Sequence, residues 1–108
     1  MDLLCKLEPQ RKKGQEVLKR FVIERGIPGI GDFSDTELCS AARASNTALS
    51  EMKASVQWEH SYVTGNKTFC VYLAETEQDI RNHAEKSGFP VDTITEVRHV
   101  IDPMTGND

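Results

Sequence analysis

The chain has 108 residues, of which 38% are hydrophobic and 28% charged, with 17 acidic and 13 basic side chains and a formal net charge of -4. These values are typical of one globular domain and exclude a disordered or low-complexity chain, while the acidic balance argues against nucleic-acid binding, which needs a basic surface. No apolar run approaches the roughly 18 residues that span a bilayer, so we expect a cytoplasmic protein without membrane contact.

The first 17 residues are predicted to be an extension, separate from the folded body. They contain a proline, a glycine and the basic run Arg11–Lys13, which is typical of a flexible terminus. The apolar stretch after Met1 is too short for a signal peptide, and three acidic residues argue against a transit peptide. We therefore expect a flexible extension over 1–17 and a single domain over 18–108.

The body begins with a strand and a helix. Residues 18–25 (LKRFVIER) are rich in β-branched and aromatic side chains, which favours a strand, and the glycines of residues 26–31 end it. Ser34 and Glu37 have the spacing of a capping box, which predicts a helix over about 35–53. Apolar or small side chains recur there at helical spacing: Leu38, Ala41, Ala42, Ser45, Ala48, Leu49 and Met52.

A hairpin, a second helix and a last strand complete the body. Residues 56–63 (VQWEHSYV) and 68–74 (TFCVYLA) are strand-like segments joined by a short turn, which indicates a hairpin. A second helix follows, with Thr76 as its N-terminal cap and Gly88 as its C-terminal cap. Its buried stripe is Ile80, His83, Ala84 and Ser87. Residues 94–101 (ITEVRHVI) predict the last strand.

The predicted elements follow the order βαββαβ. Connections this short favour an α+β, ferredoxin-like fold with a four-stranded antiparallel sheet. Two amphipathic helices cover one face of such a sheet and leave the other face open. Alternation along the third strand assigns Phe69, Val71 and Leu73 to the helices, and Cys70 and Tyr72 to the open face. In the last strand, the same alternation turns Val97 and Ile101 toward the helices, with His99 between them in phase.

The register of the hairpin decides where the aromatic side chains of its first strand point. A two-residue turn places Tyr62 opposite Phe69, so that Trp58, His60 and Tyr62 face the helices. A three-residue turn over 64–66 shifts the pairing by one residue and turns the same three side chains to the open face. We favour the three-residue turn because it gathers polar-tipped aromatic side chains away from the core.

An open sheet face that carries imidazole, thiol, phenol and carboxylate groups needs a cover, and the simplest cover is a second copy of the chain. Two such sheets facing each other form a dimeric α/β barrel with an enclosed lumen, in which two-fold symmetry duplicates every site. His60 and Cys70 are candidate metal ligands there, because imidazole and thiolate bind transition metals. His83 falls on the inward face of its helix, where it is a core histidine, a ligand or a general base.

The motifs of the body resemble those of a known family. The segments FVIERGIPG, AARASN…EM, WEHSYV, KTFCVY, IRNHAEKSGFP and EVRHVIDP are similar to those of small bacterial proteins first catalogued as a domain of unknown function, whose characterised branch binds nickel. The resemblance covers residues 18–105. It implies a ferredoxin-like fold, an α/β-barrel homodimer and nickel held within the dimer. The residues that match the motifs of the family are Glu24, Trp58, Tyr62, Cys70, Tyr72 and His83.

Two hypotheses of function follow. The first is a non-enzymatic, cytoplasmic homodimer that sequesters or senses nickel, or another divalent transition metal, in the lumen of the barrel. Its metal ligands would be His60, Cys70 and His83. Tyr62, Tyr72 and Glu24 would be oxygen ligands, or would contact the ligands without binding the metal themselves. The alternative is a small dimeric α/β-barrel enzyme, monooxygenase-like or isomerase-like. It would act on a small organic substrate in the lumen, with His60 or His83 as acid or base.

Overall fold

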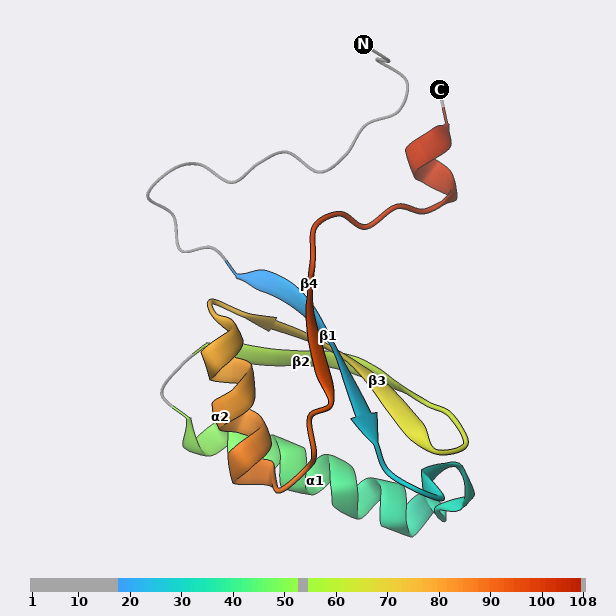
Figure 1. Cartoon of the computed structure of the whole chain (residues 1–108), viewed down its shortest axis with the longest axis vertical. Coiled ribbons are helices and arrows are strands. Elements are labelled where there is room, and N and C mark those ends of the chain that lie inside the picture. Colours follow the sequence, from blue (N-terminus) through green and yellow to red (C-terminus); the bar gives the residue numbers. More distant parts are fainter. Residues whose placement is uncertain (1–17, 53–54, 108) are drawn as a thin grey trace.

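The computed structural model describes residues 18–52 and 55–107 (Figure 1). The predicted extension over 1–17 lies outside these residues. The elements are β1 (Lys19–Gly26), the 3-10 helix η1 (Ile30–Asp32), α1 (Asp35–Glu51), β2 (Val56–Val63), β3 (Lys67–Ala74), α2 (Glu77–Ser87), β4 (Thr93–Val97) and the 3-10 helix η2 (Pro103–Gly106). The predicted βαββαβ order is confirmed.

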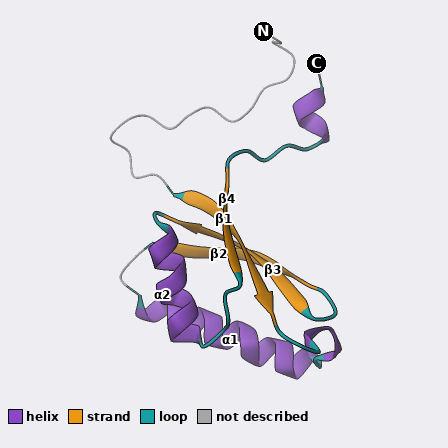
Figure 2. Ribbon diagram, viewed as in Figure 1, coloured by secondary structure: helices purple, strands orange, loops and turns teal. Residues whose placement is uncertain are grey.

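The four strands form one sheet in the order β2-β3-β1-β4, and all three pairings are antiparallel. Both helices pack on the same face of this sheet (Figure 2). This arrangement confirms the predicted α+β, ferredoxin-like fold. Within the described parts of the chain, no helix is long and apolar enough to cross a membrane.

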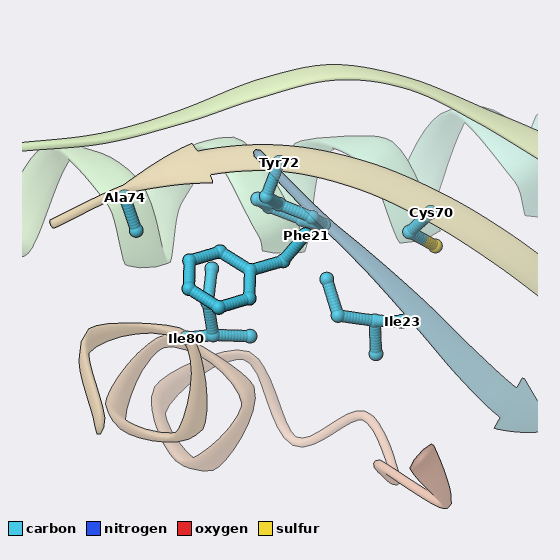
Figure 3. Close-up of a cluster of buried hydrophobic side chains, with 6 residues drawn as sticks. All are labelled: Phe21, Ile23, Cys70, Tyr72, Ala74 and Ile80. Atoms are coloured by element: carbon cyan, nitrogen blue, oxygen red, sulfur yellow. The ribbon is translucent and has the colours of Figure 1, made fainter. Parts of the chain in front are cut away.

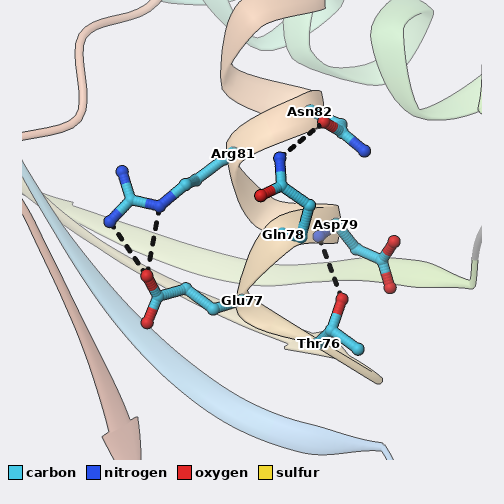
Figure 4. Close-up of polar contacts among 6 residues, drawn as sticks. All are labelled: Thr76, Glu77, Gln78, Asp79, Arg81 and Asn82. Carbon is cyan, nitrogen blue, oxygen red and sulfur yellow. Dashed lines mark hydrogen bonds and ion pairs between the residues drawn. The ribbon is translucent and has the colours of Figure 1, made fainter.

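Both helices begin at the predicted caps. At α1, the Ser34 hydroxyl accepts the backbone N–H of Glu37 at 3.2 Å, and the Glu37 carboxylate accepts the N–H of Ser34 at 2.9 Å. This reciprocal pair satisfies two amides that the helix itself leaves unpaired. At α2, the Thr76 hydroxyl accepts the N–H of Asp79 at 3.2 Å (Figure 4). Gly88 ends α2 with a φ of 80°, a conformation that glycine adopts without strain.

The core lies between the sheet and the two helices. Ile23 of β1 and Ile80 of α2 are fully buried at its centre. The cluster consists of Phe21, Ile23, Cys70, Tyr72, Ala74 and Ile80 (Figure 3). Its members come from the two central strands and from α2, so burial of this cluster holds α2 against the sheet.

The two faces of β3 are the reverse of those predicted. Cys70 and Tyr72 are 6% and 2% exposed and face the helices. They lie opposite Ile23 and Phe21 of β1, and directly opposite residues share a face. The prediction was wrong because it read Cys and Tyr as open-face residues, although a free cysteine packs as a small apolar group and a tyrosine is readily buried when its hydroxyl has a partner. The open face carries Phe69, Val71 and Leu73 instead.

A β-bulge in β2 divides its aromatic side chains between the two faces. The pairing with β3 passes directly from Trp58 to His60, which makes Glu59 the extra residue. Trp58 therefore faces the helices and packs against the core, whereas His60 and Tyr62 lie on the open face. The prediction kept these three aromatic side chains together, because a bulge leaves no mark on the alternation of residue types.

The turn between β2 and β3 is the two-residue turn, so the three-residue register that we favoured is wrong. Tyr62 lies opposite Phe69, and the Thr64 N–H donates to the Lys67 carbonyl at 2.9 Å. His60 and Tyr62 nevertheless lie on the open face, as predicted. They do so because their partners Phe69 and Val71 lie on the open face of β3, whereas the bulge lies beyond His60 and moves only Trp58 to the other face.

Strand β4 is shorter than predicted and ends at Val97. Val97 lies opposite Arg20 on the open face, not toward the helices. Since β1 itself begins at Lys19, it offers almost no further backbone for pairing beyond that point. The chain then runs away from the sheet to η2 (Figure 1).

Candidate functional site

The open face of the sheet is apolar at its centre. Directly opposite residues form three rows across β2, β3, β1 and β4. The rows are Tyr62, Phe69, Glu24 and Thr93; His60, Val71, Val22 and Thr95; and Gln57, Leu73, Arg20 and Val97. Four apolar side chains, Val22, Phe69, Val71 and Leu73, come from the two central strands, and no helix among residues 18–52 and 55–107 covers them.

Charged side chains of both signs flank this apolar centre. Arg20 donates two hydrogen bonds to the Glu59 carboxylate, at 2.8 Å and 3.2 Å, across the breadth of β3. These hydrogen bonds lower the pKa of the Glu59 carboxyl. At the other end of the face, the Lys67 ammonium lies 3.5 Å from the Glu24 carboxylate. The face therefore presents two ion pairs around an apolar centre.

His60 and Tyr62 form a pair of rings on the outer strand of this face. Their centroids lie 5.0 Å apart with the planes at 81°, an edge-to-face contact. Tyr62 is 62% exposed, and His60 is also exposed. An exposed imidazole in this position is accessible to a metal ion from solvent.

A buried polar chain lies on the opposite side of the sheet, between β3 and the two helices. The Ser45 hydroxyl lies 3.3 Å from the Tyr72 hydroxyl and 3.3 Å from His83 Nε2. His83 Nε2 also lies 3.2 Å from the Ser45 carbonyl. A carbonyl only accepts, so Nε2 must carry the hydrogen, which assigns the tautomer. His83 Nδ1 is left buried without a partner among the described residues.

Burial sets the protonation of this polar chain. Desolvation lowers the pKa of His83 below its usual 6.5, although the hydrogen bond to the Ser45 backbone opposes the effect. Desolvation also raises the pKa of Tyr72 above its usual 10.0, against the hydrogen bond from Ser45 and the charge of Arg25. Both side chains are therefore neutral at neutral pH.

Arg25 is the least expected member of this side of the sheet. It is 2% exposed, and its Nη1 donates to the Pro90 carbonyl at 2.9 Å. Its guanidinium carbon lies 5.9 Å from the centroid of the Tyr72 ring. Nη2 is buried and makes no hydrogen bond, and no ion pair between Arg25 and a carboxylate occurs within the described residues.

A cavity of about 230 Å³ lies between α1 and the helix-facing side of the sheet. Arg25, Ser45 and Tyr72 line it together with two further aromatic side chains, Trp58 and Phe89. Most of the remaining lining is aliphatic and comes from α1 and the segment after β1. The Trp58 indole N–H donates to the Ser61 hydroxyl at 3.0 Å, which fixes the plane of the indole.

The sheet separates the six predicted ligands into two groups of three. Glu24, His60 and Tyr62 lie on the open face, and Cys70, Tyr72 and His83 lie beneath the helices. Within the open-face group, His60 and Tyr62 are in contact, but β3 separates them from Glu24, at a strand-to-strand distance of about 10 Å. Across residues 18–52 and 55–107, no group of three or more His, Cys, Asp or Glu side chains is placed to hold a metal ion.

Sequence reasoning missed Arg25 and Ser45 as site residues. A signal for Arg25 was present, because it continues the two-residue alternation of Phe21 and Ile23, the apolar side of β1. A basic residue in phase with a buried stripe indicates a buried charge. Ser45 was identified as part of the buried stripe of α1, but its contacts with Tyr72 and His83 depend on how α1 packs across β3 and α2.

Comparisons with known proteins agree with the motifs. The family described as nickel-responsive, SCO4226-like proteins matches residues 21–97 of the chain, which confirms the family resemblance. The crystal structure of SCO4226 from Streptomyces coelicolor A3(2) is similar, with a TM-score of 0.61 and 20% sequence identity over 72% of this chain and 94% of that one. At this identity, the similarity shows a common fold. No curated protein matches the chain.

Proposed function

We propose that the chain, which belongs to the SCO4226-like family of nickel-responsive proteins, is a homodimer that binds nickel between two open sheet faces. The nickel would be cargo or signal, and no catalytic step is part of the proposal. The observation that carries the proposal is the uncovered apolar sheet face with an exposed imidazole, His60, on it.

The chemistry of the open face favours a second copy of the chain as its cover. A contiguous apolar surface on a small domain is typical of an interaction site. The charges around it have both signs, with Arg20 and Lys67 against Glu24 and Glu59. Two-fold symmetry can bring the basic groups of one copy against the acidic groups of the other, so such a face can complement itself.

The segment after β4 supports the same partner. Val100, Ile101 and Met104 are each more than half exposed. This segment continues from Val97, which lies on the open face at the edge strand of the sheet (Figure 1). In the proposed dimer, its apolar side chains pack against the second copy.

His60 is the central ligand of the proposed metal site. Imidazole suits nickel, and two-fold symmetry would supply a second His60 from the other copy. Tyr62 contacts the same ring, and Glu24 is the carboxylate on this face that the sequence predicted as a ligand. Cys70, Tyr72 and His83 lie on the other side of the sheet, so the proposal draws no ligand from them.

A thermal-shift titration of the chelator-stripped protein against nickel, copper, zinc and cobalt tests the metal site. A ligand that binds only the folded state raises the melting temperature, so we expect nickel to stabilise the protein and His60→Ala to abolish the shift. Cys39→Ala is the matched control, because Cys39 is an exposed potential ligand on α1, on the other side of the sheet, and its loss should leave the shift unchanged. A nickel shift that persists in His60→Ala would contradict the assigned ligand, and no shift in the wild-type protein would refute metal binding.

A further inference from the structure

We propose that the cavity beneath α1 binds a small aromatic carboxylate, with the carboxylate paired to Arg25 and the ring among Trp58, Tyr72 and Phe89. The cavity lies on the helix-facing side of the sheet, opposite the face assigned to the dimer and to nickel. A test of this ligand site is therefore independent of the test of the proposed function.

The buried guanidinium supplies the first argument. A charge taken out of water is strongly destabilising unless it is paired. Arg25 is 2% exposed, yet among the described residues its one acceptor with good hydrogen-bond geometry is the Pro90 carbonyl, and Nη2 has none. The Tyr72 hydroxyl interacts with the guanidinium only weakly, as the smallest influence on the pKa of Tyr72. The two N–H groups of Nη2 are donors without an acceptor, and an anion in the adjoining cavity would satisfy them.

The geometry of arginine selects the class of anion. A guanidinium presents parallel N–H groups that match the two oxygens of a carboxylate or two oxygens of a phosphate. The walls of the cavity decide between these groups. Most of the lining is aliphatic or aromatic, so a fully hydrated phosphate would leave that surface unused, whereas an aromatic carboxylate covers it and still reaches Arg25.

The volume of the cavity and the aromatic side chains in its lining limit the size and shape of the rest of the ligand. A volume of about 230 Å³ lies below the range of about 300–1,000 Å³ that is typical of sites for drug-sized molecules. The ligand is therefore small, on the scale of one ring. Three aromatic side chains in the lining, Trp58, Tyr72 and Phe89, favour a flat aromatic group through offset or edge contacts.

The chain carries its own reporter for this site. Trp58 is the single tryptophan of the chain and lines the cavity. We would titrate the protein with phenylacetate and with its neutral analogue 2-phenylethanol, and follow the tryptophan fluorescence. The charge-assisted hydrogen bonds to Arg25 should make phenylacetate bind about tenfold tighter or more. Equal affinity for the two probes would overturn the role of Arg25, and binding of neither would overturn the site.

Variants separate the charge from the cavity. Arg25→Met should remove the preference for phenylacetate, and it should fold because replacement of a buried charge by an apolar side chain is often neutral or stabilising. Arg43→Met, at an exposed position of α1, is the matched control and should keep the preference. Ala42→Leu extends a side chain of α1 into the cavity and should weaken both probes. An unchanged phenylacetate affinity in Arg25→Met or in Ala42→Leu would refute the proposal, as would tighter binding of inorganic phosphate than of phenylacetate.

Discussion

His83 shows how a titratable side chain can be held neutral in the core of a small domain. The ring is fully buried, its Nε2 donates to the Ser45 carbonyl, and desolvation lowers its pKa. Prediction from sequence placed it on the inward face of its helix and left three roles open. The structure brings it into contact with Tyr72, with ring centroids 5.1 Å apart, and places it on the opposite side of the sheet from His60.

The lowered pKa of His83 makes stability depend on pH in a defined direction. The unfolded chain takes up a proton at the usual pKa of 6.5, whereas the folded protein does so only at a lower pH. Below about pH 6.5 the unfolded state therefore binds more protons, and the free energy of unfolding decreases as the pH falls toward the folded pKa.

Denaturant unfolding at about pH 7.5 and about pH 5.5 measures this contribution. The wild-type protein should lose more stability between these two values than His83→Gln, whose amide stays neutral and can still donate to the Ser45 carbonyl. His99→Gln, at an exposed position, should behave as the wild type. An equal loss in the wild type and in His83→Gln would show that His83 does not carry the effect.

At the scale of elements, local signals predicted the structure well and pairing signals did not. The caps at Ser34, Thr76 and Gly88 depend on residues within one turn of each other, and all three are confirmed. The faces of β3 follow from the packing of Cys70 and Tyr72 with Phe21 and Ile23 of β1, and the division of β2 is set by the extra residue Glu59. The candidate site inherited that error, because a side chain moves to the other face with each one-residue change in register.

The bulge at Glu59 can be tested by two single-residue deletions. Removal of Glu59 should leave Trp58, His60 and Tyr62 opposite their present partners, since the bulged residue has none in β3. The protein should fold, lose the ion pair with Arg20 and keep its response to nickel. Removal of Ser61 instead moves His60 to the position of Ser61, opposite Cys70 and beneath the helices. This change should abolish the response to nickel.

Thermal unfolding and the nickel titration on both deletion variants give the readout. A loss of the nickel shift on deletion of Glu59, with a folded protein by circular dichroism, would contradict the assigned register.

At the scale of the whole molecule, the sheet divides the protein into two chemically different sides. One side is covered by α1 and α2 and contains the buried polar chain and the cavity beneath α1. The other side is an apolar surface bordered by ion pairs, and no other element of the described residues covers it. The predicted cytoplasmic location and the alternative of a small enzyme stay predictions, since both depend on properties beyond a single chain's fold.

Native mass spectrometry of the chelator-stripped protein, before and after addition of nickel, tests the central claim most directly. We expect the mass of two chains, with a whole number of nickel ions after addition. Val71→Asp places a carboxylate at the centre of the open face and should give single chains, because an unpaired buried charge is costly. Val63→Asp, at a half-exposed position on the other side of the sheet, should stay a dimer. A wild-type protein that remains a single chain, or a Val71→Asp variant that remains a nickel-loaded dimer, would contradict the account.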